Sequence, residues 1–214
     1  MLTVKTFVVN MIEENCYVVS DETGEALIID CGALRSEEQN EIRDYIARHE
    51  LVPKHLLCTH GHFDHVFGNS FIRETYGLLP EMHRSDWELY SGVTDQVRLI
   101  LHKEGAYDCP PIGGELTDGQ IIRWGRHQLE VIATPGHTQG GVCFYCAAEH
   151  LLFSGDSLFL HSVGRTDLPG GSGVQLLHSL ATRIMKLPAD TLVYPGHGPR
   201  TTIGGEARHN PYLS

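Results

Sequence analysis

Four short apolar runs in this sequence each end in a glycine-containing turn that carries histidine or aspartate. The run HLLC leads into THGHFDH at positions 59–65, while VIATPGH, LLFSGD and LVYPGH end in His137, Asp156 and His197. Glycine permits a tight turn, and the end of a strand fixes the side chain that follows it. This repeated pattern predicts that four strand ends meet at one pocket lined by metal-binding side chains.

The spacing within THGHFDH suggests two metal positions. In extended backbone, His60 and His62 point the same way, so they can bind one ion. Asp64 and His65 are adjacent and should reach a different side as the chain curls into a helix. A plausible division gives one ion His60, His62 and His137 and the other ion Asp64, His65 and His197, with Asp156 as a bridge. Imidazoles and carboxylates without a thiolate suit Zn²⁺, and also iron or manganese.

Composition excludes several other classes of protein. The chain has 214 residues, most simply one domain over 1–214, and a formal net charge of −11 without a basic block. Binding to nucleic acid or to an anionic membrane by charge is therefore not expected. The sequence has no run of 18 apolar residues, and its start lacks the apolar core of a signal peptide. We expect a soluble cytoplasmic protein; the sequence leaves its oligomeric state open.

Periodicity predicts strands mixed with helices. We expect helices over 36–48, capped by Ser36, over 66–76, closed by Gly77, and from a cap at Ser85 to Leu101. A further helix should carry the stripe Leu177, Leu180, Ile184 and Leu187. The segment 107–119 resembles a loop, and strands are expected over 2–9, 15–20, 25–30, 55–58, 121–124, 128–134, 141–146, 151–154 and 191–195. This order favours a mixed α/β layered domain over regular βαβ winding.

The six cysteines do not form a second metal or redox motif. Cys143 and Cys146 make a C-x-x-C spacing, but they lie in VCFYC, which has the composition of a strand. Residues three apart on a strand point to opposite faces. We therefore expect ordinary buried thiols.

At these residues the sequence resembles the metallo-β-lactamase superfamily, and within it the glyoxalase II (hydroxyacylglutathione hydrolase)-like branch. The resemblance runs through ALIIDCG, THGHFDH, TPGHT, SGDSLF, VGRTDLPGG and YPGHGPRTTIG. It implies an αβ/βα four-layer sandwich, in which two sheets pack face to face between outer helices. It also implies two metal ions divided as above. Because few residues follow His197, the similarity is to short bacterial hydrolases rather than to full-length glyoxalase II with its glutathione-gripping extension.

Comparison within the superfamily narrows the function that the resemblance implies. Asp156 differs from the cysteine of one group of antibiotic-hydrolysing members, and His62 differs from the glutamate of the diiron flavoproteins. The resemblance favours a thioesterase with a small-molecule thioester substrate. The alternative is a mononuclear iron persulfide dioxygenase, since Arg165-Thr166-Asp167 resembles a motif of those enzymes. A lactonase or other ester hydrolase, or a non-enzymatic metal-binding module, is a lower-ranked reading.

The implied chemistry assigns roles to individual residues. A hydroxide that bridges two ions would attack the thioester carbonyl, with Asp156 as bridging ligand and Asp64 as a ligand that also orients the hydroxide. Asp30 either orients a ligand histidine or is a plain turn residue. Either Arg165 and Asp167 form an ion pair that stabilises the site, or Arg165 contacts an anionic substrate.

Overall fold

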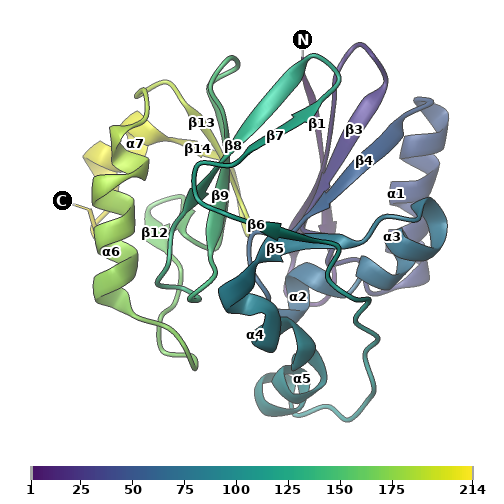
Figure 1. Cartoon of the computed structure of the whole chain (residues 1–214). Helices are drawn as coiled ribbons and strands as arrows, with labels where there is room; N and C mark the ends of the chain where they lie inside the picture. Colours follow the sequence, from purple (N-terminus) through teal and green to yellow (C-terminus); the bar gives the residue numbers. More distant parts are fainter. Residues whose placement is uncertain (1, 214) are drawn as a thin grey trace.

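Residues 2–213, which the computed structural model describes, form two six-stranded sheets packed face to face (Figure 1). The first sheet has the order β1-β2-β3-β4-β5-β6, antiparallel from β1 to β3 and parallel from β3 to β6. Its strands are β1 (Thr3–Val9), β2 (Glu14–Ser20), β3 (Glu25–Ile29), β4 (Val52–Leu57), β5 (Pro80–His83) and β6 (Gly114–Leu116).

The second sheet has the order β14-β13-β10-β9-β8-β7, and only the β10–β13 pair is parallel. Its strands are β7 (Ile121–Trp124), β8 (His127–Ala133), β9 (Val142–Cys146), β10 (Leu151–Gly155), β13 (Leu192–Pro195) and β14 (Thr201–Thr202). A small ribbon of β11 (Leu158–Phe159) and β12 (Ser162–Val163) follows β10.

Some helices cover the outer faces of the two sheets. Others lie at the end of the sheets from which the segment 59–65 follows β4. The helices are α1 (Ser36–Arg48), α2 (Phe63–Val66), α3 (Asn69–Tyr76), α4 (Trp87–Ser91), α5 (Val93–Leu101), α6 (Gly173–Thr182) and α7 (Ile203–His209), with 3₁₀ turns at Arg84–Asp86 and Ile184–Lys186. Within residues 2–213, none of these helices has the length and apolar character that a membrane crossing requires.

Alternation along β2 explains why the sheets form layers. Tyr17 and Val19 face the core between the two sheets, whereas Cys16 and Val18 face the core beneath α1 and α3. Successive strand residues point to opposite faces, so a strand buried on both sides is apolar throughout. The second sheet is covered on its outer side by α6 and α7. The predicted mixed α/β, four-layer fold is confirmed.

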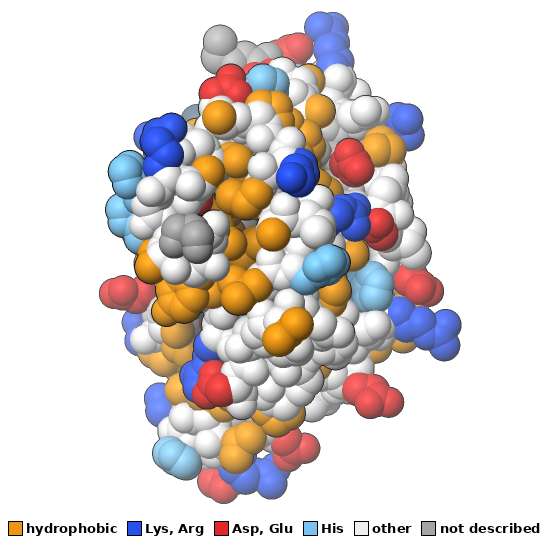
Figure 2. Space-filling model, turned by 90° about the vertical axis from the view of Figure 1, so that its left-hand side faces the viewer, with side chains coloured by type: hydrophobic (Ala, Val, Ile, Leu, Met, Phe, Trp, Pro, Cys, Tyr) orange, Lys and Arg blue, Asp and Glu red, His pale blue; other side chains and the backbone are white. Residues whose placement is uncertain are grey.

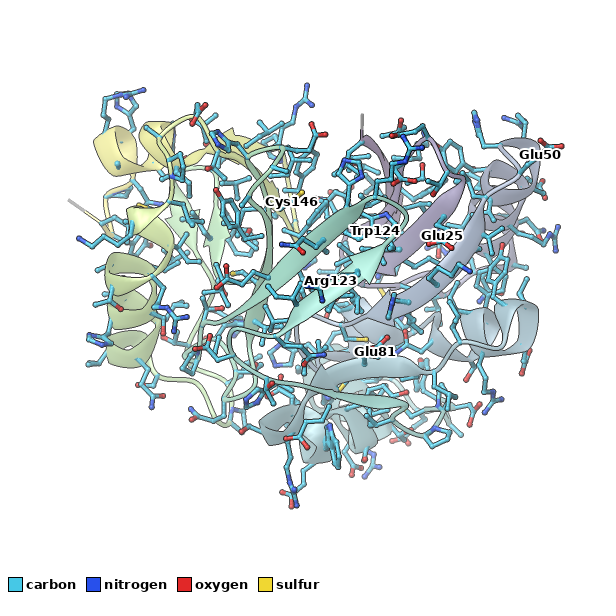
Figure 3. All side chains as sticks on the ribbon, turned by 45° about the horizontal axis from the view of Figure 1, so that its top comes forward. Glu25, Glu50, Glu81, Arg123, Trp124 and Cys146 are labelled. Atoms are coloured by element: carbon cyan, nitrogen blue, oxygen red, sulfur yellow. The ribbon has the colours of Figure 1, made fainter. Side chains whose placement is uncertain are left out.

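The two sheets are tied together at the end farthest from the α4–α5 pair (Figure 3). Trp124 of β7 is buried between the sheets, and the next residue, Gly125, donates its backbone N–H to Glu25 of β3 at 2.6 Å. Cys146 also belongs to this inner core, whereas Cys143 faces the outer one. The described cysteines are all free, which confirms the prediction of ordinary thiols on opposite faces.

Several expected elements differ in the structure. The segment 107–119 is not all loop, because Gly114–Leu116 forms β6 and buries Leu116 completely. The strands β5 and β14 and the helix α7 were not predicted, since each is short and proline or glycine hides its periodicity. The α1 bounds are confirmed, but Glu38 rather than Ser36 caps it by accepting the Arg35 N–H at 2.9 Å.

Helices on the two sides of the molecule also depart from the expected pattern. The segment from Ser85 to Leu101 breaks at Gly92 into α4 and α5. On α6 the buried leucines are Leu176 and Leu180, while Leu177 is 38% exposed, so the predicted stripe began one residue too late. Figure 2 shows hydrophobic side chains on the side of the molecule that carries α6.

Candidate metal centre

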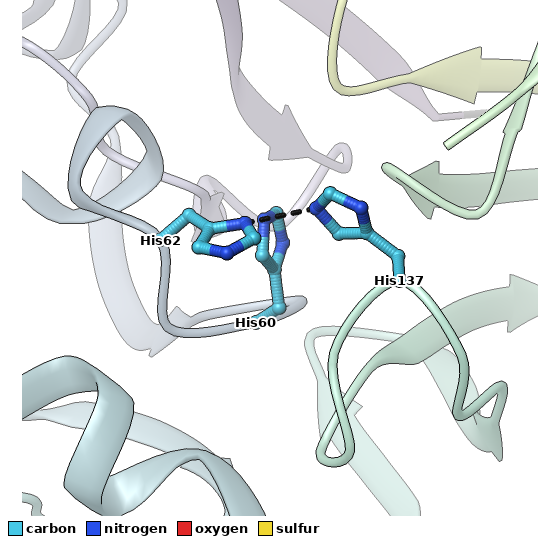
Figure 4. A group of neighbouring side chains, drawn as sticks. All are labelled: His60, His62 and His137. Atoms are coloured by element: carbon cyan, nitrogen blue, oxygen red, sulfur yellow. Dashed lines mark hydrogen bonds between the residues drawn. The ribbon is translucent and has the colours of Figure 1, made fainter. Parts of the chain in front are cut away.

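The segment 59–65 follows β4 and runs into α2, and it carries four of the candidate ligands. Buried leucines at the end of β4 anchor the segment. His60, His62 and His137 converge from this segment and from the turn after β8 (Figure 4). Their ligand-competent atoms lie within 4.8 Å of one another, and His62 Nδ1 is 2.9 Å from His137 Nε2. We call these three residues the first triad.

Asp64, His65 and His197 form a second triad beside the first. Their ligand-competent atoms also lie within 4.8 Å of one another. The Asp64 carboxylate is 3.1 Å from His197 Nε2 and 3.6 Å from His65 Nε2. The structure thus brings together the two groups of residues that the spacing suggested.

Asp156 contacts members of both triads. Its Oδ1 atom is 3.3 Å from His65 Nε2, and its Oδ2 atom is 3.5 Å from His137 Nε2 and 3.7 Å from His197 Nε2. One carboxylate therefore reaches both groups, as a bridging ligand must.

The donor set fits a pair of divalent cations. His60 Nε2, His65 Nε2 and Asp156 Oδ1 are buried without a hydrogen bond of good geometry. Buried polar atoms are costly when they lack a partner, and three of them facing one space call for a cation. Five imidazoles and two carboxylates are ligands that zinc and iron both accept.

The protonation of these side chains follows from burial and charge. Burial lowers the pKa of His60 well below its usual value and that of His62 to about 3, so both imidazoles are neutral and have a lone pair available for a cation. Burial opposes the protonation of His65 too, but the carboxylates of Asp156 and Asp64 outweigh it and raise the His65 pKa. A divalent cation would compete with a proton at His65.

Asp30 lies behind the second triad and is not a plain turn residue. Its carboxylate accepts hydrogen bonds from the Thr59 N–H at 2.7 Å and from the Thr59 hydroxyl at 2.6 Å. It also lies 3.0 Å from His65 Nδ1, which turns the Nε2 atom of His65 toward Asp156. Such a contact fixes the tautomer and orientation of a ligand histidine.

Asp86 joins the two loops that carry the first triad, and no sequence motif points to it. This buried carboxylate accepts hydrogen bonds from Gly61 N–H at 3.0 Å, from Gly140 N–H at 2.6 Å and from the Thr138 hydroxyl at 2.7 Å. Gly61 lies between His60 and His62, and Thr138 follows His137. A single aspartate therefore sets the spacing between both loops.

The turn that carries His197 is held by β2. Asn15 donates its side-chain amide to the carbonyls of Pro195 and Gly198, and Tyr17 donates its hydroxyl to Pro195 at 2.6 Å. Gly196 has no room for a side chain, because a Cβ atom there would overlap the carboxylate of Asp156. Sequence reasoning identified the glycine turn, but not its partners on β2.

Arg165 and Asp167 form an exposed ion pair, with Nε and Nη2 of Arg165 at 2.8 Å and 2.7 Å from the two carboxylate oxygens. The backbone of Arg165 does more for the site than this pair. Its carbonyl accepts a hydrogen bond from His137 Nδ1 at 2.7 Å, which directs His137 Nε2 toward the first triad. The Arg165 side chain lines the cavity above the triads.

A cavity of about 470 Å³ opens over the two triads. Five candidate ligands reach it, and most of its other lining residues are apolar. Those apolar residues are Ile12, Phe63, Ile100, Phe159, Val163 and Leu168. Such a cavity can hold a small molecule against the triads while keeping bulk water away.

The metallo-beta-lactamase superfamily model matches residues 12–197, so the chain belongs to this superfamily. Hydroxyacylglutathione hydrolase GloC of Haemophilus influenzae is 30% identical over 220 residues, which cover 100% of this chain and 99% of that protein. The probable metallo-hydrolase YqgX of Bacillus subtilis is 34% identical over 207 residues, covering 96% and 95%. The chain is thus a relative of metallo-hydrolases along its whole length.

Solved structures agree with this assignment. The BLEG-1 B3 metallo-beta-lactamase has a TM-score of 0.91 and 34% identity, with 99% of this chain and 100% of that chain covered. TTHA1623 in a di-iron-bound form has a TM-score of 0.86 and 36% identity, with 98% and 100% covered. The recognition of the superfamily and its fold from sequence motifs is confirmed.

Proposed function

We propose that this protein is a dinuclear metal-dependent hydrolase of thioesters, of the hydroxyacylglutathione hydrolase type. It would convert a thioester and water into a carboxylate and a thiol. The observation that carries the proposal is the pair of triads with Asp156 in contact with both. The likeness to the relative named hydroxyacylglutathione hydrolase supports the choice of a thioester.

Two divalent ions, when bound, supply an activated water and a Lewis acid for the carbonyl oxygen. His60, His62 and His137 would hold one ion and Asp64, His65 and His197 the other, with Asp156 shared. Asp64 and Asp156 are the proposed catalytic carboxylates, since both border the cavity in which the carbonyl carbon must sit.

The surrounding residues keep these side chains in place. Asp30 holds His65, the Arg165 carbonyl holds His137, and a substrate bound against the apolar cavity wall would displace water from the site. Exclusion of water strengthens the electrostatic interactions inside the site. A thiolate is a good leaving group, so the reaction needs no dedicated general acid to protonate the departing sulfur atom.

The test is to load the purified protein with Zn²⁺ or Fe²⁺, count the ions by elemental analysis and assay S-D-lactoylglutathione. We expect two ions per chain and hydrolysis. Asp156→Ala should abolish metal retention and turnover, because both triads lose their shared carboxylate. Asp190→Ala, at an exposed aspartate paired with His150, is the matched control and should retain both.

Other outcomes would replace the proposal. An Asp156→Ala protein with two ions and full activity would overturn the scheme. One iron per chain and oxygen consumption with glutathione persulfide would favour the dioxygenase, which needs only His60, His137 and Asp156. Because a similar structure is a metallo-beta-lactamase, the substrate panel should include a β-lactam and a lactone beside the thioester.

A further inference from the structure

We infer that the substrate is a thioester with an extended apolar acyl chain, and that this chain lies in a groove between α5 and the loop 164–172. The inference rests on the proposed thioester hydrolase and adds the class of acyl group. It also predicts that thioesters with a long apolar acyl chain are hydrolysed faster than S-D-lactoylglutathione.

The groove is continuous with the candidate metal centre. A second cavity of about 230 Å³ adjoins the one over the triads. The two cavities share His62, Ile100 and Leu168 as lining residues. A substrate whose carbonyl lies at the triads can therefore extend past His62 into the second cavity.

The walls of the second cavity are largely apolar. We call its apolar wall the acyl groove, formed by Leu89, Leu99, Ile100, Leu168 and Pro169. Leu99 on α5 is 64% exposed, so covering it with an acyl chain would remove apolar surface from water. The common cellular thiols are polar or charged, so the part of a thioester that matches this apolar groove is the acyl group.

The polar side chains of the groove offer little to a charged thiol. Gln96 donates its amide to the carbonyls of Gly61 and Leu89, so its donors are already used. The two charged residues on this wall are Glu88 and Asp95, and Asp95 already contacts Arg98 at 2.6 Å. A carboxylate accepts hydrogen bonds and donates none, so neither residue offers a partner to an anion.

Few cationic side chains line the two cavities. Among described residues that line the two cavities, Arg165 is the only lysine or arginine. Its guanidinium is held by Asp167 through two hydrogen bonds. Glutathione carries two carboxylates, and among these lining residues the one guanidinium that could pair with them is already shared with Asp167. The side chains that line the two cavities therefore favour a thiol carrier without carboxylates.

Chain-length dependence tests the inference directly. With metal-loaded protein, kcat/KM should rise from acetyl to butyryl to octanoyl thioesters of N-acetylcysteamine, a neutral thiol. Leu99→Ser should lower kcat/KM about tenfold for the octanoyl thioester and leave the acetyl thioester unchanged. Leu177→Ser, at an exposed leucine of α6 outside the groove, is the matched control and should change neither.

A binding measurement separates this inference from the proposed function. An octanoyl analogue with a methylene group in place of the sulfur cannot be hydrolysed. By calorimetry it should bind about tenfold more weakly to Leu99→Ser than to wild type. Equal binding to both proteins, or faster hydrolysis of S-D-lactoylglutathione than of octanoyl thioesters, would overturn the acyl groove alone. Analogue binding without hydrolysis of any thioester would overturn the proposed function and leave the acyl groove as a binding site for an apolar chain.

Discussion

Asp86 accepts hydrogen bonds from both loops that carry the first triad, although it is not itself a candidate ligand. We expect Asp86→Asn to lower the affinity for the first ion by about 10- to 100-fold, the usual effect of losing a partner behind the ligands. The amide keeps the shape of the carboxylate, but its NH₂ group faces backbone donors instead of accepting from them. Competition with a chromogenic chelator measures the affinity.

The control for this variant is Asp190→Asn, because Asp190 is exposed and pairs with His150, which is not a candidate ligand. It should bind both ions like wild type. If Asp86→Asn also binds them like wild type, the spacing of the two loops does not depend on this carboxylate.

Individual candidate ligands could be predicted from the sequence, but the residues that orient them mostly could not. His60, His62, Asp64 and His65 lie within one short segment, so local spacing identifies them. Asp86 has no such signature, because its partners lie 25 and 54 residues away and are mainly backbone N–H groups. Asp30 was considered in advance as one of two readings, and so was bracing by the Arg165–Asp167 pair, although it is the Arg165 carbonyl that contacts His137.

The parallel strands β4 and β5 carry a side-chain pair whose strength depends on pH. His55 Nδ1 of β4 lies 2.6 Å from the Glu81 carboxylate of β5. This hydrogen bond raises the pKa of His55 above its ordinary value, despite partial burial. The folded state therefore binds the proton more tightly than the unfolded chain, and the pair stabilises the fold fully below about pH 6.5.

The stabilising contribution of this pair should fall as the pH rises through the raised pKa of His55. Urea unfolding of wild type and Glu81→Gln between about pH 5.5 and 9 measures it. We expect wild type to be the more stable at low pH, with a difference that shrinks toward high pH. Glu74→Gln, on the exposed face of α3, should show no such trend. A difference independent of pH would contradict the assignment to His55.

Long elements were predictable, and short ones were not. The helix α1 has several turns and one clear apolar stripe, so its bounds agree with the sequence pattern. The strands β5 and β6 have only four and three residues, which is too short for alternation to be visible. The break at Gly92 depends on how α4 and α5 pack, which local spacing does not encode.

Both sheets contribute to the two triads, so metal binding should stabilise the whole molecule. A ligand at 100 times its dissociation constant adds about 2.7 kcal/mol to the free energy of unfolding. For a chain of this size we expect Zn²⁺ to raise Tm by about 5–10 °C over chelator-treated protein. Calorimetry measures Tm; Mg²⁺, which prefers oxygen ligands, should have little effect. Zn²⁺ should not raise Tm of Asp156→Ala.

The face-to-face packing of the sheets was predictable only through family resemblance. Residue patterns alone indicated a mixed α/β layered fold, because strand periodicity shows which faces are buried but not which sheet covers them. The inner core brings β2 and β3 against β8 and β9 across long sequence separations. Those contacts are a property of the assembled fold.

The order of the candidate ligands along the chain has a consequence for synthesis. A polypeptide made from its N-terminus acquires His60, His62, Asp64 and His65 early, with the first sheet. Neither triad is complete at that stage, since one waits for His137 and the other for His197. On the proposed function, a newly made chain would acquire its metal pair late, after the second sheet has packed onto the first.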